Sequence, residues 1–288
     1  MRPSEPPHRE PLPRQAAGLP SLGAEAAEVL GAGVREMGLQ LSPDVLAGID
    51  SHARLLDAWG RHVNLTAIRE PVAVMRLHVL DSLAAVAPIR ARIPGARSLV
   101  DIGSGGGYPG IPLGLAMGVA RLSLVESVGR KARFLEVAGA EAAAALGGTA
   151  PAVEVLPERS EAVAAGSRRA TWDVATVRAV GDVAECAELG LPLVRVGGWL
   201  VCWKREREEA TREASLQAEV DAARALVGRL GGGSPEVIAA GVPGAPGHRL
   251  VLIHKERPTP AMFPRSTVAR RPGRDRATPR VGGETARS

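Results

Sequence analysis

A carboxylate followed by a run of glycines is the strongest chemical signal in the chain. The segment LVDIGSGGGYPGIPL, residues 99–113, places a strand-like run before Asp101 and several glycines, including Gly103 and Gly105, before a helical run. In an open α/β sheet, ligands bind beyond the carboxyl ends of the strands, and glycines there permit a tight turn and close backbone approach. The segment therefore indicates a nucleotide- or nucleoside-binding turn.

The acidic residue in front of this turn favours one ligand over another. A dinucleotide fingerprint G-x-G-x-x-G fails from Gly103, because Tyr108 stands at the third glycine position, but it can be forced by starting from Gly105. Asp101 would repel a pyrophosphate, whereas it can interact with the amino group of a methionine moiety. The turn therefore predicts S-adenosylmethionine as cofactor, with a generic turn as the alternative.

Three further positions fit the same ligand. Glu126 ends the second strand-like run, 25 residues after Asp101, where a carboxylate can accept both ribose hydroxyls. A solvated acidic loop residue is the alternative. Ser160 and Glu161 follow the third run, where a seven-stranded methyltransferase contacts the adenine, and Arg178 ends the fourth run.

The elements that must position these residues alternate between strands and helices. Apolar runs without polar alternation cover 98–103, 122–127, 152–156, 172–178, 198–204, 236–240 and 249–255, with helical stretches such as 128–146 and 182–194 between the first five. This pattern is typical of a mostly parallel sheet covered on both faces, and the last two runs fit a hairpin at its edge. We therefore predict an α/β fold: a Rossmann-like class I S-adenosylmethionine-dependent methyltransferase with a seven-stranded sheet.

Composition divides the chain into four parts. Residues 1–20 are rich in Pro, Arg and Glu and predict disorder. Residues 21–89 predict an N-terminal helical cap, with helices that begin at Ser42-Pro43-Asp44 and near Glu70-Pro71. Residues 90–258 form the predicted methyltransferase domain, and residues 259–288 a basic, largely flexible tail.

Charge and apolar content narrow the partners. The longest apolar runs fall short of the roughly 20 residues of a membrane span, the N-terminus has no apolar signal region, and Cys186 and Cys202 lack metal-like spacing. We therefore expect a cytoplasmic protein with no membrane, no metal and no evident obligate protein partner. The formal net charge is +5, and residues 255–288 carry nine basic and three acidic residues, so the remainder sums to +5 − 6 = −1. The basic tail fits RNA, with a solubilising tail as the alternative.

The fourth strand restricts the methyl acceptor. It continues as VRAVGD, residues 177–182, rather than as the Asn/Asp-Pro-Pro-aromatic motif that accompanies methylation of exocyclic amines. Both cysteines lie in apolar runs typical of core, so a cysteine nucleophile is not expected. An acceptor that is already nucleophilic remains, and guanine N7 is one, since its lone pair carries no proton and no general base is required. Catalysis would then consist of alignment and desolvation.

At this point the chain resembles a known family, the RsmG (glucose-inhibited division protein B) small-subunit rRNA guanine-N7 methyltransferases. The resemblance runs from about residue 55 to 204. It rests on NLTAI (64–68), RLHVLDSL (76–83), DIGSGGGYPGIPL (101–113), LVES (124–127), RKARFLE (130–136), ERSEA (158–162), VRAV (177–180) and GGWLVCWK (197–204).

The resemblance implies methylation of a guanine in the decoding-region hairpin of 16S rRNA, on naked RNA or on a small ribosomal subunit particle. It implies cofactor contacts at Gly103, Tyr108, Ser160, Glu161 and Arg178, to which Asp101, Gly105 and Glu126 are added. Asn64, His78, Asp81 and Lys204 should lie near the cofactor or RNA. The RNA-binding candidates are Asn64, His78, Arg130, Lys131, Lys204 and Arg265, and the positioning candidates are His78, Arg178 and Lys204.

Structural alternatives accompany these roles. His78 and Asp81 lie three apart on one helix face and could be a pair that ties the cap to the sheet. Asn64 could belong to a helix-exit turn, and Lys204 could be an edge lysine or a phosphate ligand. Tyr108, His78 or an arginine would stack on the target base.

Two departures from the family concern the RNA side. Arg205 replaces a usual glycine, and STVARR follows Phe263-Pro264-Arg265 where the family has Tyr-Pro-Arg and a glycine. Two rival functions stay open: methylation of a small molecule or protein, and a non-catalytic RNA-binding assembly factor with S-adenosylmethionine as structural ligand.

Overall fold

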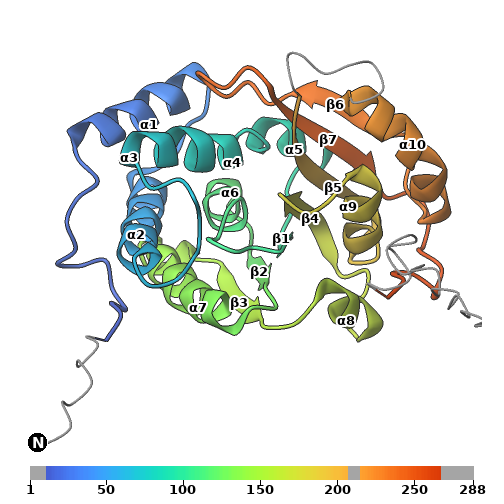
Figure 1. Cartoon of the computed structure of the whole chain (residues 1–288), viewed down its shortest axis with the longest axis horizontal. Helices are drawn as coiled ribbons and strands as arrows, with labels where there is room; N and C mark the ends of the chain where they lie inside the picture. The colour runs from blue at the N-terminus through green and yellow to red at the C-terminus, as the bar shows by residue number, and fades with distance from the viewer. Residues whose placement is uncertain (1–10, 207–214, 267–288) are drawn as a thin grey trace, which may run out of the picture.

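A single seven-stranded sheet organises the protein (Figure 1). The structure is a computed structural model, and it describes residues 11–206 and 215–266. The strand order is β3-β2-β1-β4-β5-β7-β6, with β1 to β5 parallel and β7 antiparallel to both neighbours. The strands are β1 (Ser98–Ile102), β2 (Arg121–Val125), β3 (Ala152–Leu156), β4 (Trp172–Arg178), β5 (Val194–Arg205), β6 (Glu236–Ala239) and β7 (His248–His254). The predicted α/β class and the terminal hairpin are confirmed.

Helices cover both faces of this sheet, which explains the unbroken apolar runs of its strands. Successive residues of β1 point to opposite faces, so Leu99 joins the core under α6 and α7, and Val100 the core under α8, α9 and α10. The helices of the domain are α6 (Gly110–Met117), α7 (Gly129–Ala144), η2 (Gly147–Thr149), α8 (Ser160–Ala165), α9 (Val183–Gly190) and α10 (Leu216–Arg229).

A helical cap lies on the α6–α7 side. It consists of α1 (Ala24–Glu36), α2 (Pro43–Gly60), α3 (Pro71–Val74), the π-helix η1 (Met75–Leu80), α4 (Asp81–Leu83) and α5 (Val86–Arg92). The two predicted helix starts are confirmed, because the Ser42 hydroxyl accepts the Val45 amide hydrogen at 3.3 Å and the Glu70 carboxylate accepts those of Val72 and Ala73. These hydrogen bonds fix where α2 and α3 begin. The η1 segment of the cap reaches the edge of the sheet that carries the glycine turn.

One helical segment of the cap is long and largely apolar. The continuous helical segment Pro71–Arg92 has 22 residues and a mean hydropathy of 1.6, so by length and composition it is sufficient to cross a membrane. The segment includes Arg76, Asp81 and Arg90, so charged residues interrupt it and each of its uninterrupted apolar runs is short. About two thirds (67%) of its most apolar stretch is buried inside the protein. Its apolar character is accounted for by packing in the core between cap and sheet.

Two stretches with disorder-like composition are fixed in place, which corrects the predicted boundaries. Residues 11–20 pack on the cap and α7: the Trp59 indole donates to the Pro13 carbonyl at 2.8 Å, and the Ala16 amide to the Glu141 carboxylate at 2.9 Å. Residues 259–266 are also anchored, with Phe263 buried. Residues 1–10 and 267–288, the rest of the two predicted tails, lie outside the described residues.

Candidate functional site

The carboxylate of Asp101, just before the glycine turn, is bonded to the elements around the turn. Asp101 is fully buried; its Oδ1 accepts the Thr176 hydroxyl at 2.7 Å and its Oδ2 the Gly110 amide at 3.2 Å, at the start of α6. Burial raises the pKa of Asp101 to about 6, against the opposing effect of these hydrogen bonds. Asp101 thus joins β1, β4 and α6, and its contact with a methionine amino group stays a prediction.

The glycines adopt conformations that other residues avoid. Gly103, Gly105 and Gly107 have φ values of +68°, +52° and +84°. A Cβ on Gly103 would lie 3.1 Å from a methyl group of Val180, in the loop after β4. The backbone therefore passes between two strand ends with no room for a side chain. Such a cradle fits the close approach of a nucleoside cofactor.

Glu126 lies beside this turn, as its position at the end of the second strand predicted. Its Oε2 accepts the Gly105 amide at 3.0 Å, and its Oε1 accepts the Val128 amide at 2.8 Å. Each carboxylate oxygen has further lone pairs, so the group can still accept from a ligand. The ribose contact itself stays a prediction.

Two helix starts share this edge of the sheet. Parallel strands end at one edge, so the first turns of α7 and α8 follow β2 and β3 there. Ser160 is buried and Glu161 half-buried at the start of α8, while Arg130 is exposed and Lys131 half-buried at the start of α7. Adenine contacts at α8 and RNA contacts at α7 stay predictions that this placement permits.

Arg178 is the centre of a polar cluster between sheet and cap. Its Nη1 donates to the Asp81 carboxylate at 3.1 Å, and its Nη2 donates to Nδ1 of His78 at 3.1 Å. The second Asp81 oxygen lies 2.7 Å from Nδ1 of His248, on β7. The side chains of Arg178 and Asp81 are only 17% and 4% exposed. The His78–Asp81 pair is therefore part of a tie between cap and sheet, which the sequence offered as one of two alternatives.

The hydrogen bonds of His78 fix its protonation. Because Nδ1 accepts from Arg178, Nε2 carries the hydrogen, and it lies 2.7 Å from the Thr66 hydroxyl. Burial, together with the positive charge of Arg178, lowers the pKa of His78 to about 4. At neutral pH the imidazole is uncharged, and both of its nitrogens are engaged.

Tyr108 is packed against two histidines rather than open to a target base. Its ring centroid lies 4.5 Å from that of His52 and 4.9 Å from that of His78, and the Arg178 guanidinium lies 5.6 Å from it. The residue is 5% exposed, so in this conformation it cannot stack on a base. Within residues 11–206 and 215–266 its buried hydroxyl has no hydrogen-bond partner.

Two predicted RNA ligands are engaged within the protein. Lys204 Nζ donates to the Glu219 carboxylate at 2.6 Å and to the Gly181 carbonyl at 2.8 Å. Arg265 forms a two-pronged pair with the buried carboxylate of Glu188. Arg169, just before β4, donates to the Phe263 carbonyl at 2.8 Å. Arg265, two residues after Phe263, therefore lies near the edge of the sheet where β4 begins, opposite the edge that carries the glycine turn. The structure does not bring Arg265 to the candidate site.

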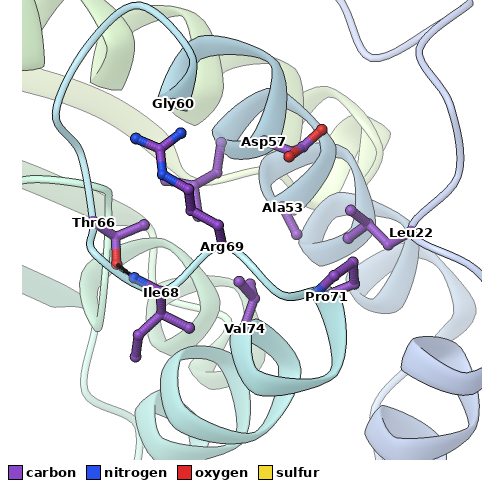
Figure 2. A pocket seen from close by; sticks show the side chains of 10 residues that line it. Leu22, Ala53, Asp57, Gly60, Thr66, Ile68, Arg69, Pro71 and Val74 are labelled. Atoms are coloured by element: carbon purple, nitrogen blue, oxygen red, sulfur yellow. Dashed lines mark hydrogen bonds between the residues drawn. The ribbon is translucent and has the colours of Figure 1, made fainter.

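A small pocket lies in the cap, next to Thr66 (Figure 2). Thr66, whose hydroxyl accepts the Ile68 amide and pairs with His78, forms one wall, with Asp57 and Arg69 as charged neighbours. The other lining residues are apolar or glycine and come from α2, α3, Leu22 and Ile68 in the loop before α3. The walls belong to the cap, so this pocket is separate from the glycine turn. Asn64, two residues before Thr66, is exposed in the same loop.

His52, which sequence analysis missed, joins α2 to the glycine turn and predicts a pH effect on stability. Its Nε2 lies 2.8 Å from the Gly106 carbonyl, and burial lowers its pKa to about 4. The unfolded chain therefore binds a proton between pH 6.5 and 4 that the folded protein does not, so the free energy of unfolding falls on acidification through that range. The full effect is about 3 kcal/mol.

The variant His52→Gln tests this, because the amide can donate to the same carbonyl without titrating. Unfolding by urea at pH 7 and pH 4 should show a loss on acidification that is smaller by about 3 kcal/mol in the variant. Asp101 acts in the opposite direction, since its raised pKa makes stability fall as pH rises from about 4 to 6, but it is common to both proteins. Equal pH dependence in the two proteins would refute the assignment.

Comparison with known proteins gives consistent matches. The family described as rRNA small subunit methyltransferase G (GidB) matches residues 46–228. Proteins named ribosomal RNA small subunit methyltransferase G are similar over most of the chain. The one from Dehalococcoides mccartyi (strain CBDB1) is 35% identical over 81% of this chain and 93% of its own length. The one from Roseiflexus sp. (strain RS-1) is 37% identical over 83% and 96%.

Proposed function

The chain belongs to the rRNA small subunit methyltransferase G family, and from that premise we propose that it methylates N7 of a guanine. It is an S-adenosylmethionine-dependent methyltransferase of 16S rRNA. The proposal for the acceptor atom rests on one observation: the two candidate bases beside Arg178, His78 and Asp81, already have partners within the protein. His78 is neutral with both nitrogens bonded, and both oxygens of Asp81 are paired.

Guanine N7 fits such a site. Its lone pair attacks the methyl group directly and no proton leaves the acceptor in the transition state, so the protein needs only to align two partners and exclude water. An exocyclic amine or a hydroxyl would lose a proton, and a base within hydrogen-bond reach would assist it. The arrangement of His78 and Asp81 therefore supports N7 over those acceptors.

The residues of the turn fit the cofactor. We expect Gly103 and Gly105 to leave space for its methionine part, Glu126 to accept its ribose hydroxyls, and Ser160 and Glu161 to contact its adenine. When bound, S-adenosylmethionine supplies an activated methyl group on its sulfonium. Arg178, held by Asp81 and His78, would fix the acceptor side of the turn relative to that group.

The substrate side is proposed from exposure and charge. Asn64, Arg130 and Lys131 are accessible or half-accessible, and no ion pair engages Arg130 or Lys131 within the described chain. We expect them to contact 16S rRNA or a small-subunit particle in the cytoplasm. A basic charge in residues 267–288 would add sequence-independent affinity. A non-catalytic assembly factor with bound S-adenosylmethionine is the rival, and it predicts no methyl transfer.

The absence of a titrating base predicts a flat pH profile. At saturating cofactor and RNA, the single-turnover rate should vary little between about pH 6.5 and 9. Burial and the charge of Arg178 lower the pKa of His78 to about 4, outside this window, so His78 should add no step to the profile. Rapid-quench measurement across the window checks the prediction. A tenfold rise of rate for each pH unit, abolished by one substitution, would assign the methyl group to an amine or hydroxyl instead.

A further inference from the structure

The loop between β4 and α9, residues 179–182, is built on unfavourable backbone conformations. Ala179 has φ +58° and Gly181 has φ +48°. For an alanine the left-handed conformation costs about 1 kcal/mol, so the loop requires partners that hold it. At Gly181 the positive φ disfavours residues that carry a Cβ, and a Cβ there would also displace the Glu185 side chain.

This loop connects the two halves of the candidate site. Arg178, immediately before it, carries the polar cluster with Asp81 and His78. Val180, within the loop, lies against Gly103, because a Cβ built on Gly103 would be 3.1 Å from a methyl group of Val180. A shift of the loop would therefore move both the cofactor turn and the arginine that faces the acceptor.

Two side chains from outside the loop hold its backbone. Lys204, near the end of β5, donates to the Gly181 carbonyl at 2.8 Å. Glu219, in the first turns of α10, accepts the Val183 amide at 2.6 Å. The same Glu219 oxygen accepts from Lys204 Nζ at 2.6 Å, so the two side chains form one unit. The Lys204 side chain is 10% exposed, which leaves little of it for an external phosphate.

The charge state of this unit is consistent with an ion pair. Burial alone lowers the pKa of Lys204, but the neighbouring Cys186 and the hydrogen bond and charge of Glu219 outweigh it and raise the pKa. The ammonium is therefore charged when it binds the Gly181 carbonyl. The Cys186 thiol also donates to the Val180 carbonyl, at 2.8 Å between sulfur and oxygen, and so holds a further backbone group of the loop.

We propose that Lys204 and Glu219 are positioning residues for methyl transfer, which act by fixing the β4–α9 loop and not by contacting RNA. The proposal rests on the methyltransferase function proposed above. Glu219 belongs to none of the motifs that the sequence singled out, and the sequence left Lys204 open as a positioning residue, a phosphate ligand or an edge lysine. In the structure, Lys204 serves the loop, and the two residues depend on each other.

The test uses Lys204→Met, Glu219→Ala and the double variant in the full chain. Each single variant should lower the single-turnover rate roughly 10- to 100-fold, because small misplacements of catalytic groups have effects of that size. The double variant should be no slower than the slower single variant, since both changes remove one unit. The salt dependence of RNA binding should keep its slope. Asp221→Ala, on the exposed face of the same helix, is the matched control and should keep the wild-type rate.

A second readout does not depend on activity. Hydrogen–deuterium exchange of the amides of residues 179–183 should be faster in both variants than in wild type and unchanged in Asp221→Ala. If Lys204→Met reduces the logarithmic salt slope by about 1 while Glu219→Ala has no effect on rate, Lys204 is a phosphate ligand and the proposal is wrong. Wild-type rates and exchange in both variants would also overturn it. If the wild type transfers no methyl group to 16S rRNA, the proposed function fails, while loop exchange still decides the role of the pair.

Discussion

The variant Gly103→Val should lose binding of S-adenosylhomocysteine, the demethylated product of the cofactor, by at least 100-fold. A β-branched residue at φ +68° is strained, and its Cβ would lie 3.1 Å from Val180 and fill the cradle that the ligand needs. Isothermal titration calorimetry measures the affinity directly. NAD should give no heat with either protein, because the carboxylate of Asp101 would repel a pyrophosphate.

Gly118→Val is the matched control for this result. Gly118 ends α6 with φ +65°, nearly the same backbone conformation, but no atom lies within 4 Å of its hypothetical Cβ. Both variants therefore pay a similar backbone cost of about 1–3 kcal/mol, and only Gly103→Val alters the turn. Wild-type affinity in Gly103→Val, or equal loss in the two variants, would contradict the assignment of the glycine turn to the cofactor.

The variant Arg178→Met should lose both stability and activity. It leaves the buried carboxylate of Asp81 with His248 as its remaining side-chain partner, and removal of one member of a buried ion pair typically costs about 3–5 kcal/mol. The free energy of unfolding in urea should fall toward the lower end of that range. The methyl-transfer rate should fall further than stability explains, because His78 also loses its donor.

Arg178→Lys separates the two effects. A lysine can keep the charge beside Asp81, but it cannot reproduce the planar fork that binds Asp81 and His78 together. Stability should therefore recover in part while the rate stays low. Arg224→Met, which removes an exposed pair with Asp221, should change stability by less than about 1 kcal/mol. An Arg178→Met protein as stable and as active as wild type would show that the cluster has no role.

Features that lie within continuous sequence motifs could be predicted from the sequence alone. The glycine turn and Glu126 come directly after strands that are visible in the sequence as apolar runs, and Asp101 lies near the end of the first of these strands. Parallel strands bring their carboxyl ends to the same edge of the sheet. The strand pattern likewise predicted the terminal hairpin. The relation of Glu126 to the turn, an oxygen 3.0 Å from the Gly105 amide, follows from that topology.

The sequence could not predict the partners that fold together from distant positions. His248 pairs with Asp81 across 167 positions, and nothing in a β-strand residue near the C-terminus indicates that contact. Glu219 looks like an ordinary surface acid in an amphipathic helix, yet it binds Lys204 and the Val183 amide. His52 could have been noticed as a polar residue on the apolar face of α2, although its contact with Gly106 could not.

Predictions from charge and composition alone did not include the internal contacts of the residues concerned. The RNA-binding candidates Arg265 and Lys204 are each paired with a carboxylate of the protein, Glu188 and Glu219 respectively, and their contact with RNA stays a prediction. The segment 71–92 is apolar because it packs between cap and sheet. Residues 11–20 look disordered by composition, but carbonyl and amide groups of their backbone bind α2 and α7. Counting residue types does not reveal which ones have internal partners.

The central claim is that this protein transfers the methyl group of S-adenosylmethionine to guanine N7 in 16S rRNA. The most direct measurement incubates the full chain with unmethylated 16S rRNA, alone and as small-subunit particles, and methyl-labelled cofactor, followed by nucleoside digestion and mass spectrometry. The account predicts label in 7-methylguanosine at close to one methyl group per RNA, and none with Gly103→Val. Label in another nucleoside, or no transfer by a protein that binds the cofactor, would contradict it.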